Sequence, residues 1–191
     1  MGNLRLYNIT INTRQFLYEL DTFTGSLLAF DISKGRASKN EMLTTKVINA
    51  LNFCNNPYQL SENKLVNNSF TNFSSLKIKL TQRLIKITCK FNFWFAYKLS
   101  SQIAPILFDK TEDSINYFRK TNSQDYENVL CLPRSLFAAS TSKSFKEKGV
   151  IFIGVFLPSN SMHAWIIENG TQPDNQDTIW TNFQPVAALC Y

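Results

Sequence analysis

The chain has only one histidine, His163, among its 191 residues, and its four cysteines are widely spaced. No two cysteines have the C-x-x-C spacing of a zinc site, and four are too few for a disulfide-rich scaffold. No apolar run approaches 20 residues, which excludes a membrane-spanning helix, and the opening MGNLRLYNIT lacks the apolar core of a signal peptide. We therefore expect a cytoplasmic protein with reduced thiols, no metal site and no transmembrane segment.

Other absences narrow the function. The sequence contains no P-loop and no other nucleotide-binding motif, so we expect no cofactor. Acidic residues are missing from residues 75–100, which hold six basic side chains. Residues 1–74 carry seven basic and five acidic side chains, and residues 101–191 carry seven and nine. The net charge of residues 75–100 is therefore +6, equal to the formal net charge of the whole chain.

That segment, SLKIKLTQRLIKITCKFNFWFAYKLS, has the spacing of an amphipathic helix. Apolar residues recur at steps of three or four, namely Leu80, Leu84, Ile87, Phe91 and Phe95. The general rule for such helices predicts that this stripe faces the core and that the lysines face solvent. A basic amphipathic helix that binds a membrane or an acidic partner is the alternative.

The N-terminal third has β-strand character. Residues 15–21 and 26–31 alternate in short β-rich runs around a Thr24-Gly25 turn, which predicts an antiparallel hairpin. Residues 41–53, EMLTTKVINALNF, follow with the spacing of a short helix. A stretch rich in Asn and Ser comes next, so we place a domain boundary near residue 74. The predicted fold class is α+β, with domains at 1–74 and 75–191.

Cys131 lies where the sequence predicts the start of a helix. The pattern through Leu132, Leu136 and Phe137 is helical, and Pro133 suits a first turn because its missing N–H has no partner to lose. Peptide dipoles at a helix N-terminus favour an anion, so the pKa of the Cys131 thiol should be lowered.

The histidine belongs to a predicted hairpin. Residues 149–157 form an apolar, β-branched run, and MHAWIIE at 162–168 reads as the following strand. Asn169-Gly170 is a strong signal for a two-residue loop. With that loop, Glu168 pairs with Thr171, and the strand that follows pairs antiparallel with residues 162–168.

The register of this hairpin selects an aspartate. Trp165 would pair with Asp174 and His163 with Gln176, so Asp174 would share a face with His163. Asp177 would point away, although a shift of one residue reverses the choice.

Together these residues suggest a cysteine nucleophile site. Cys131 would attack a carbonyl, His163 would carry the proton, and Asp174 would orient the imidazole. The Cys131 backbone N–H would contribute to an oxyanion hole, while Gln124 and Asn128 are not distinguishable as donors from ordinary loop residues. A buried structural thiol, a core histidine and a turn aspartate are the non-catalytic interpretations.

Three segments, CLPRSLF, VIFIGVF and HAWIIENG, resemble the Cys-Leu-x-x-Ser, Ile-Gly-Val and His-Ala-Trp-Val-Glu elements of lasso peptide leader peptidases. These enzymes are members of the transglutaminase-like superfamily, with a papain-like cysteine protease site. The order of the elements matches, as does the separation of 32 residues between Cys131 and His163. The acidic residue after the tryptophan stands one place later than in the family, at Glu168.

The resemblance implies a fold and a function. Residues 1–74 would form a winged-helix-like precursor-recognition domain, and residues 75–191 a cysteine protease that removes the leader from a lasso precursor peptide. The leader would add as a strand beside SLLAFD, with Ser26, Leu27, Leu28, Ala29 and Phe30 as its binding residues. An ATP-dependent, asparagine-synthetase-like macrolactam synthetase would be the partner.

Two alternatives to this function stay open. A transglutaminase-like or N-acetyltransferase-like acyltransferase would use the same three residues on an amine acceptor. A non-enzymatic protein could bind nucleic acid through the basic segment at 75–100. The leader peptidase prediction implies no nucleic acid partner.

Overall fold

The computed structural model describes residues 4–12, 16–21, 23–31, 43–55, 75–103, 106–122, 130–157 and 159–191. Within these ranges the chain is mixed α+β, which confirms the predicted class. Gln124 and Asn128, the two loop residues considered as oxyanion donors, lie outside the described residues.

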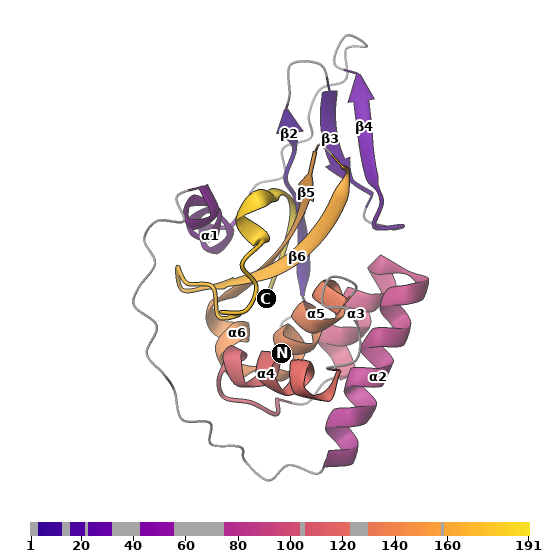
Figure 1. The fold of residues 1–191 in the computed structure, drawn as a ribbon, viewed down its shortest axis with the longest axis vertical. Helices are drawn as coiled ribbons and strands as arrows, with labels where there is room; N and C mark the ends of the chain where they lie inside the picture. The colour runs from indigo at the N-terminus through magenta and orange to yellow at the C-terminus, as the bar shows by residue number, and fades with distance from the viewer. Residues whose placement is uncertain are drawn as a thin grey trace.

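A four-stranded antiparallel sheet forms the centre of the molecule (Figure 1). Its order is β1-β7-β5-β6, with β1 at Arg5–Asn8, β5 at Gly149–Phe156, β6 at Ser161–Glu168 and β7 at Gln184–Cys190. The run GVIFIGVF is buried along all but its last residue. A strand this apolar needs cover on both faces, and the structure supplies it.

Helices cover the two faces unequally (Figure 1). On one face α5 (Cys131–Thr141) packs against β5 and β6, and α6 (Lys143–Lys148) contacts β5. The helices α2 (Ser75–Phe91), α3 (Phe93–Ile103) and α4 (Thr111–Thr121) pack around α5. The other face meets α1 (Thr45–Asn55) and the short helix η3 (Trp180–Asn182). Alternate residues of a strand point to opposite faces, so Ile151 and Ile153 join the larger core while Val150 and Phe152 join the core under α1.

The predicted N-terminal hairpin is confirmed. β3 (Phe16–Leu20) and β4 (Leu27–Asp31) pair antiparallel, with β2 (Ile11–Asn12) on the other side of β3. Gly25 in the turn has φ of 75°, which glycine adopts without strain. The Asp21 carboxylate stabilises the same turn by accepting hydrogen bonds from the Phe23 N–H and the Thr24 hydroxyl.

The predicted division near residue 74 does not coincide with a break in packing. β1 is an edge strand of the central sheet and pairs with β7. The predicted helix at 41–53 forms as α1, and its Val47 and Phe53 lie in one core with Trp165. Residues before and after position 74 therefore share hydrophobic cores, and a winged-helix-like N-terminal domain stays a prediction.

The basic segment differs from the sequence prediction in two respects. It forms two helices, because the Asn92 side chain accepts the Phe95 N–H at 3.0 Å and starts α3. The stripe expected to face the core is instead exposed at four of its five positions, namely Leu80, Ile87, Phe91 and Phe95. The opposite side of α2 is held inward by hydrogen bonds from Gln82 to Thr121 and from Lys86 to Asn122.

The packing at Gly154 generates a stability prediction. A Cβ added there would lie 2.6 Å from the Trp165 ring and 2.8 Å from the Gln184 carbonyl oxygen. We expect Gly154→Ala to lower the free energy of unfolding by about 2 kcal/mol or more, since overpacking of a close-packed core costs about 1–3 kcal/mol. Urea denaturation followed by circular dichroism measures it.

Gly170→Ala provides the comparison. At Gly170 φ is 72°, but a Cβ would meet no atom within 4 Å, so only the backbone conformation is strained, at about 1 kcal/mol. If Gly170→Ala lowered the free energy of unfolding as much as Gly154→Ala or more, close contact with Trp165 would not be the reason that residue 154 is glycine.

Candidate active site

Cys131 is the first residue of α5, as the sequence predicts. Leu130 precedes it as the N-cap and offers no side-chain hydrogen bond to the helix. The first N–H groups of an α-helix have no intrahelical acceptor, and Pro133 has no N–H at all. The Cys131 sulfur therefore lies beside the positive end of the helix dipole, and the residue is 8% exposed.

His163 lies near the start of β6 and is 5% exposed. Its partner across the sheet is Gly154 on β5. The absence of a side chain at Gly154 leaves space for the Trp165 ring, which stacks beside the imidazole at a centroid distance of 6.2 Å. Phe183, which directly precedes β7, lies 5.1 Å from the imidazole, so aromatic neighbours limit the movement of this ring.

Cys131 and His163 share a hydrogen bond that changes the pKa of both. Burial works to raise the pKa of the Cys131 thiol, but the hydrogen bond and positive charge of His163, a backbone hydrogen bond from Ala164 and the charge of Arg134 bring it below its ordinary value. Burial works to lower the pKa of His163, but hydrogen bonds to Asp177 and Cys131 raise it to about 9. Both shifts favour the thiolate–imidazolium form of the pair over its neutral form.

The other three cysteines behave differently. Burial raises the pKa of Cys54 and of Cys89 to about 12, and burial also raises the pKa of Cys190. Burial is the largest cause for each of them, and at Cys190 the opposing charges of Lys46 and Arg5 do not overcome it. Cys131 is thus the one cysteine of the four whose surroundings favour the nucleophilic form.

Asp177 orients the imidazole. Its Oδ2 lies 2.8 Å from His163 Nε2, which leaves Nδ1 as the ring nitrogen for the Cys131 sulfur. A carboxylate at Nε2 holds the ring in one orientation and stabilises its positive charge. The three residues therefore form a Cys–His–Asp series of contacts, with the acid supplied by Asp177.

The predicted contact between Asp174 and His163 is wrong. The Asn169-Gly170 turn forms as expected, with φ of 51° and 72° and mutual hydrogen bonds between Glu168 and Thr171. Residues 172–179 then leave the ladder and form turns and bends, consistent with Pro173, which cannot donate to a strand. A hydrogen bond from the Asp177 N–H to the Asp174 carbonyl oxygen closes one such turn.

Asp174 instead faces two arginines. Arg119 Nη2 donates to both of its carboxylate oxygens, at 2.9 and 3.0 Å, and Arg119 Nε donates at 3.2 Å. Arg134 Nε lies 3.0 Å from Asp174 Oδ2, while Arg134 Nη2 donates to Asp177 Oδ2 at 3.2 Å. The charges therefore alternate in sign, from the Cys131 thiolate through to Arg119.

A small polar cavity adjoins this network. Its volume is about 80 Å³, and His163, Asp177, Arg119 and Arg134 form part of its wall. Gln176, Thr178 and Ile179 complete the lining. A cavity of this size holds a few water molecules, next to the ring that would exchange protons.

Sequence reasoning missed Arg119 and Arg134. Arg134 is part of the CLPRSLF motif, three residues after Cys131, so helical spacing alone places it near the thiol. It is 5% exposed, and buried arginines almost always have partners. Arg119 is on α4 with no such signal, because its proximity to Asp174 depends on how α4 packs on α5.

The predicted leader-binding residues lie on a sheet edge. Leu27, Leu28, Ala29 and Phe30 belong to β4, which pairs with β3 alone among the described strands, and Ser26 directly precedes it. Leu28 is 40% exposed. Such an edge has backbone groups available for another strand.

Comparison with known proteins found no matching family, no similar curated protein and no similar solved structure. None of the helices in the described ranges combines the length and the hydropathy of a bilayer-spanning segment. The same ranges contain no group of three or more His, Cys, Asp or Glu side chains able to hold a metal ion.

The two aspartates can be separated by the reactivity of Cys131. Iodoacetamide alkylates thiolates, so the alkylation rate of Cys131 falls as pH decreases through the lowered pKa of the thiol. Asp177→Asn removes the charge that stabilises the His163 imidazolium. We expect the midpoint of the alkylation profile to move up by about one pH unit or more.

Asp174→Asn is the matched control, because it removes one buried negative charge that faces arginine without touching His163. Its midpoint should stay near that of the unmodified chain. Peptide mass spectrometry assigns the alkylated cysteine, and circular dichroism checks folding. Equal shifts in both variants would show that Asp177 has no specific role in orienting the imidazole.

Proposed function

We propose that this protein is a cysteine peptidase that cleaves a lasso precursor peptide between leader and core. The observation that carries the proposal is the contact of Cys131 with His163, and of His163 with Asp177 at 2.8 Å. The lowered pKa of Cys131 supports a nucleophilic role, since the thiolate is the reactive form. The resemblance of the motifs at Cys131 and His163 supplies the substrate class.

The first half of the reaction forms a thioester. The Cys131 thiolate attacks the carbonyl carbon of the leader–core bond, and the negative charge moves to the carbonyl oxygen, close to the first N–H groups of α5. The tetrahedral intermediate collapses when His163 donates a proton to the leaving nitrogen. The core departs with a free amine, and the leader stays bound to sulfur.

The second half adds water. His163 is now neutral and accepts a proton from a water molecule, for which the adjoining cavity has space. The hydroxide attacks the thioester carbonyl, the carbon–sulfur bond breaks, and Cys131 leaves as a thiolate. The leader is released with a new carboxylate. The free amine of the core is the group that a macrolactam synthetase, the proposed partner, would consume.

Cleavage of a precursor peptide tests the proposal directly. We expect Cys131→Ala to abolish leader removal, because no other side chain in the site forms a thioester. Cys54→Ala and Cys89→Ala are matched controls and should keep cleavage, since burial raises the pKa of both thiols. The full-length protein is incubated with a lasso precursor peptide, and mass spectrometry detects the released leader and core.

The same experiment separates hydrolysis from acyl transfer. In ¹⁸O-labelled water a peptidase places one labelled oxygen on the leader carboxylate. An acyltransferase instead links the acyl group to an added amine. Cleavage by the Cys131→Ala variant, or an amine adduct without hydrolysis, would contradict the peptidase assignment.

Leader recognition by β4 is a second, separable prediction. Leu28→Glu puts a charge on the exposed edge strand, and we expect the leader affinity of the full chain to fall about tenfold or more, because an extended peptide bound there would lose an apolar pocket. Isothermal titration calorimetry with leader peptide measures the affinity. Alkylation of Cys131 should be unchanged.

Ile48→Glu on α1 is the control for this change, since Ile48 is 43% exposed and Leu28 is 40% exposed. Its leader affinity should equal that of the unmodified chain. If both variants bind leader normally, the recognition surface lies away from β4 while the peptidase assignment stands.

A further inference from the structure

The outer side of α2 and the start of α3 form an exposed apolar stripe. Its members on α2 recur at steps that keep them on one side of that helix, and the two on α3 follow the break at Asn92. The exposed fractions run from 44% to 82%. The members are Leu76, Leu80, Ile87, Phe91, Trp94 and Phe95. We call these six residues the α2–α3 stripe.

The opposite side of α2 is the less apolar one. Ile78 and Ile85 are buried there, but so are Thr81, Gln82 and Thr88. A helix that only had to pack on its own core would turn the leucine and phenylalanine side chains inward. Contiguous exposed apolar surface of this kind marks an interaction site.

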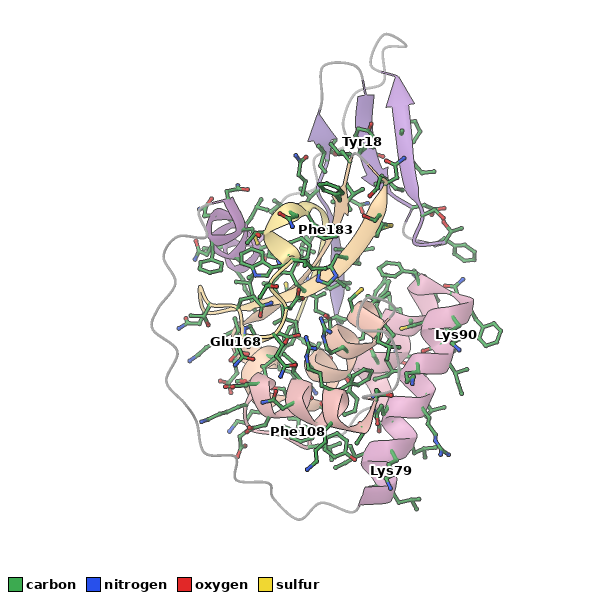
Figure 2. The ribbon with its side chains drawn as sticks, in the orientation of Figure 1. Tyr18, Lys79, Lys90, Phe108, Glu168 and Phe183 are labelled. Atoms are coloured by element: carbon green, nitrogen blue, oxygen red, sulfur yellow. The ribbon has the colours of Figure 1, made fainter. Side chains whose placement is uncertain are left out.

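Basic side chains border the α2–α3 stripe. Lys79, Arg83 and Lys90 are exposed along one flank at steps of four and seven, and Lys77 is exposed on the other side. Figure 2 shows Lys79 and Lys90 at the two ends of α2, on the side of the helix away from the sheet. Residues 75–100 contain no acidic side chain, so every charge that this segment itself places beside the stripe is positive.

We propose that the α2–α3 stripe binds the surface of an anionic phospholipid bilayer, with α2 lying in the plane of the membrane. Apolar and aromatic side chains would enter the boundary between headgroups and acyl chains, and the flanking lysines would contact lipid phosphates. Lysine suits this position because its long stem can follow the apolar surface while its ammonium stays in water. Trp94 and the two phenylalanines lie where α2 meets α3 and would anchor that end.

Charge and composition disfavour the other occupants. A second copy of this chain would oppose two rows of positive charge, which is repulsive. Protein interfaces are enriched in arginine and depleted in lysine, whereas five of the six basic residues in 75–100 are lysines. An acidic protein partner is therefore the weaker fit and becomes an outcome of the test.

Sedimentation with lipid vesicles tests the proposal on the full chain. We expect binding to vesicles with about one third phosphatidylglycerol in phosphatidylcholine, little binding to pure phosphatidylcholine, and weaker binding at about 0.5 M salt. Leu80→Ser with Phe91→Ser should reduce affinity about tenfold or more. Phe23→Ser with Ile48→Ser, at exposed apolar positions elsewhere, should not.

Charge variants provide a matched pair. Lys79→Ala with Lys90→Ala should weaken vesicle binding about tenfold. Lys143→Ala with Lys148→Ala removes the same net charge from exposed positions of α6 and should leave binding nearly unchanged. Alkylation of Cys131 should be normal in all of these variants, which keeps this test independent of the peptidase assignment.

Trp94 reports the orientation of the bound protein. It is 44% exposed, whereas Trp165 and Trp180 are 1% and 5% exposed, so vesicles with brominated acyl chains should quench mainly Trp94. Trp94→Phe should remove that quenching while vesicle binding persists. Absence of binding, binding unaffected by the stripe variants, or binding only to an acidic polypeptide or duplex DNA would overturn the proposal.

Discussion

The hydrogen bond between Cys131 and His163 favours a thiolate and an imidazolium, and a series of alternating charges extends from it into the helical layer. Asp177 holds the imidazole, Arg134 contacts Asp177 and Asp174, and Arg119 binds Asp174. Each group in this series lies beside a group of opposite charge, so no charge of the series is buried without a partner. Asp177 stabilises the imidazolium by direct contact, whereas Asp174 and Arg119 are linked to it only through Arg134.

The same series of contacts links separate parts of the fold. Cys131 and Arg134 belong to α5, His163 to β6 and Arg119 to α4, while the two aspartates lie in the segment between the Asn169-Gly170 turn and η3. Removing one partner from a buried ion pair typically costs about 3–5 kcal/mol, because the other charge stays buried. The packing of α4 on α5 therefore contributes to the stability of the site, because it places Arg119 against Asp174.

Local signals in the sequence predicted the start of α5, the strand of His163 and the Asn169-Gly170 turn. Each depends on residues close together in the chain, such as Pro133 in a first helical turn or glycine at positive φ. The choice between Asp174 and Asp177 depended on a register that ended after Thr171, and the arginine partners depended on tertiary packing. The prediction of which side of α2 faces the core was wrong for a similar reason. Periodicity locates an apolar stripe on a helix but does not show whether that stripe packs on the core or faces solvent.

The chain has one histidine, so its imidazole can be observed without ambiguity by NMR. The ¹³Cε1–¹H signal of His163, followed from about pH 5 to about pH 10, measures the pKa of the imidazole. This interval includes the pKa of a free imidazole, which is about 6.5. We predict a titration near pH 9, because Asp177 and the Cys131 thiolate both stabilise the imidazolium. Cys131→Ala should lower that value. A titration at or below the ordinary value of 6.5 in the unmodified chain would show that the thiolate–imidazolium pair does not form.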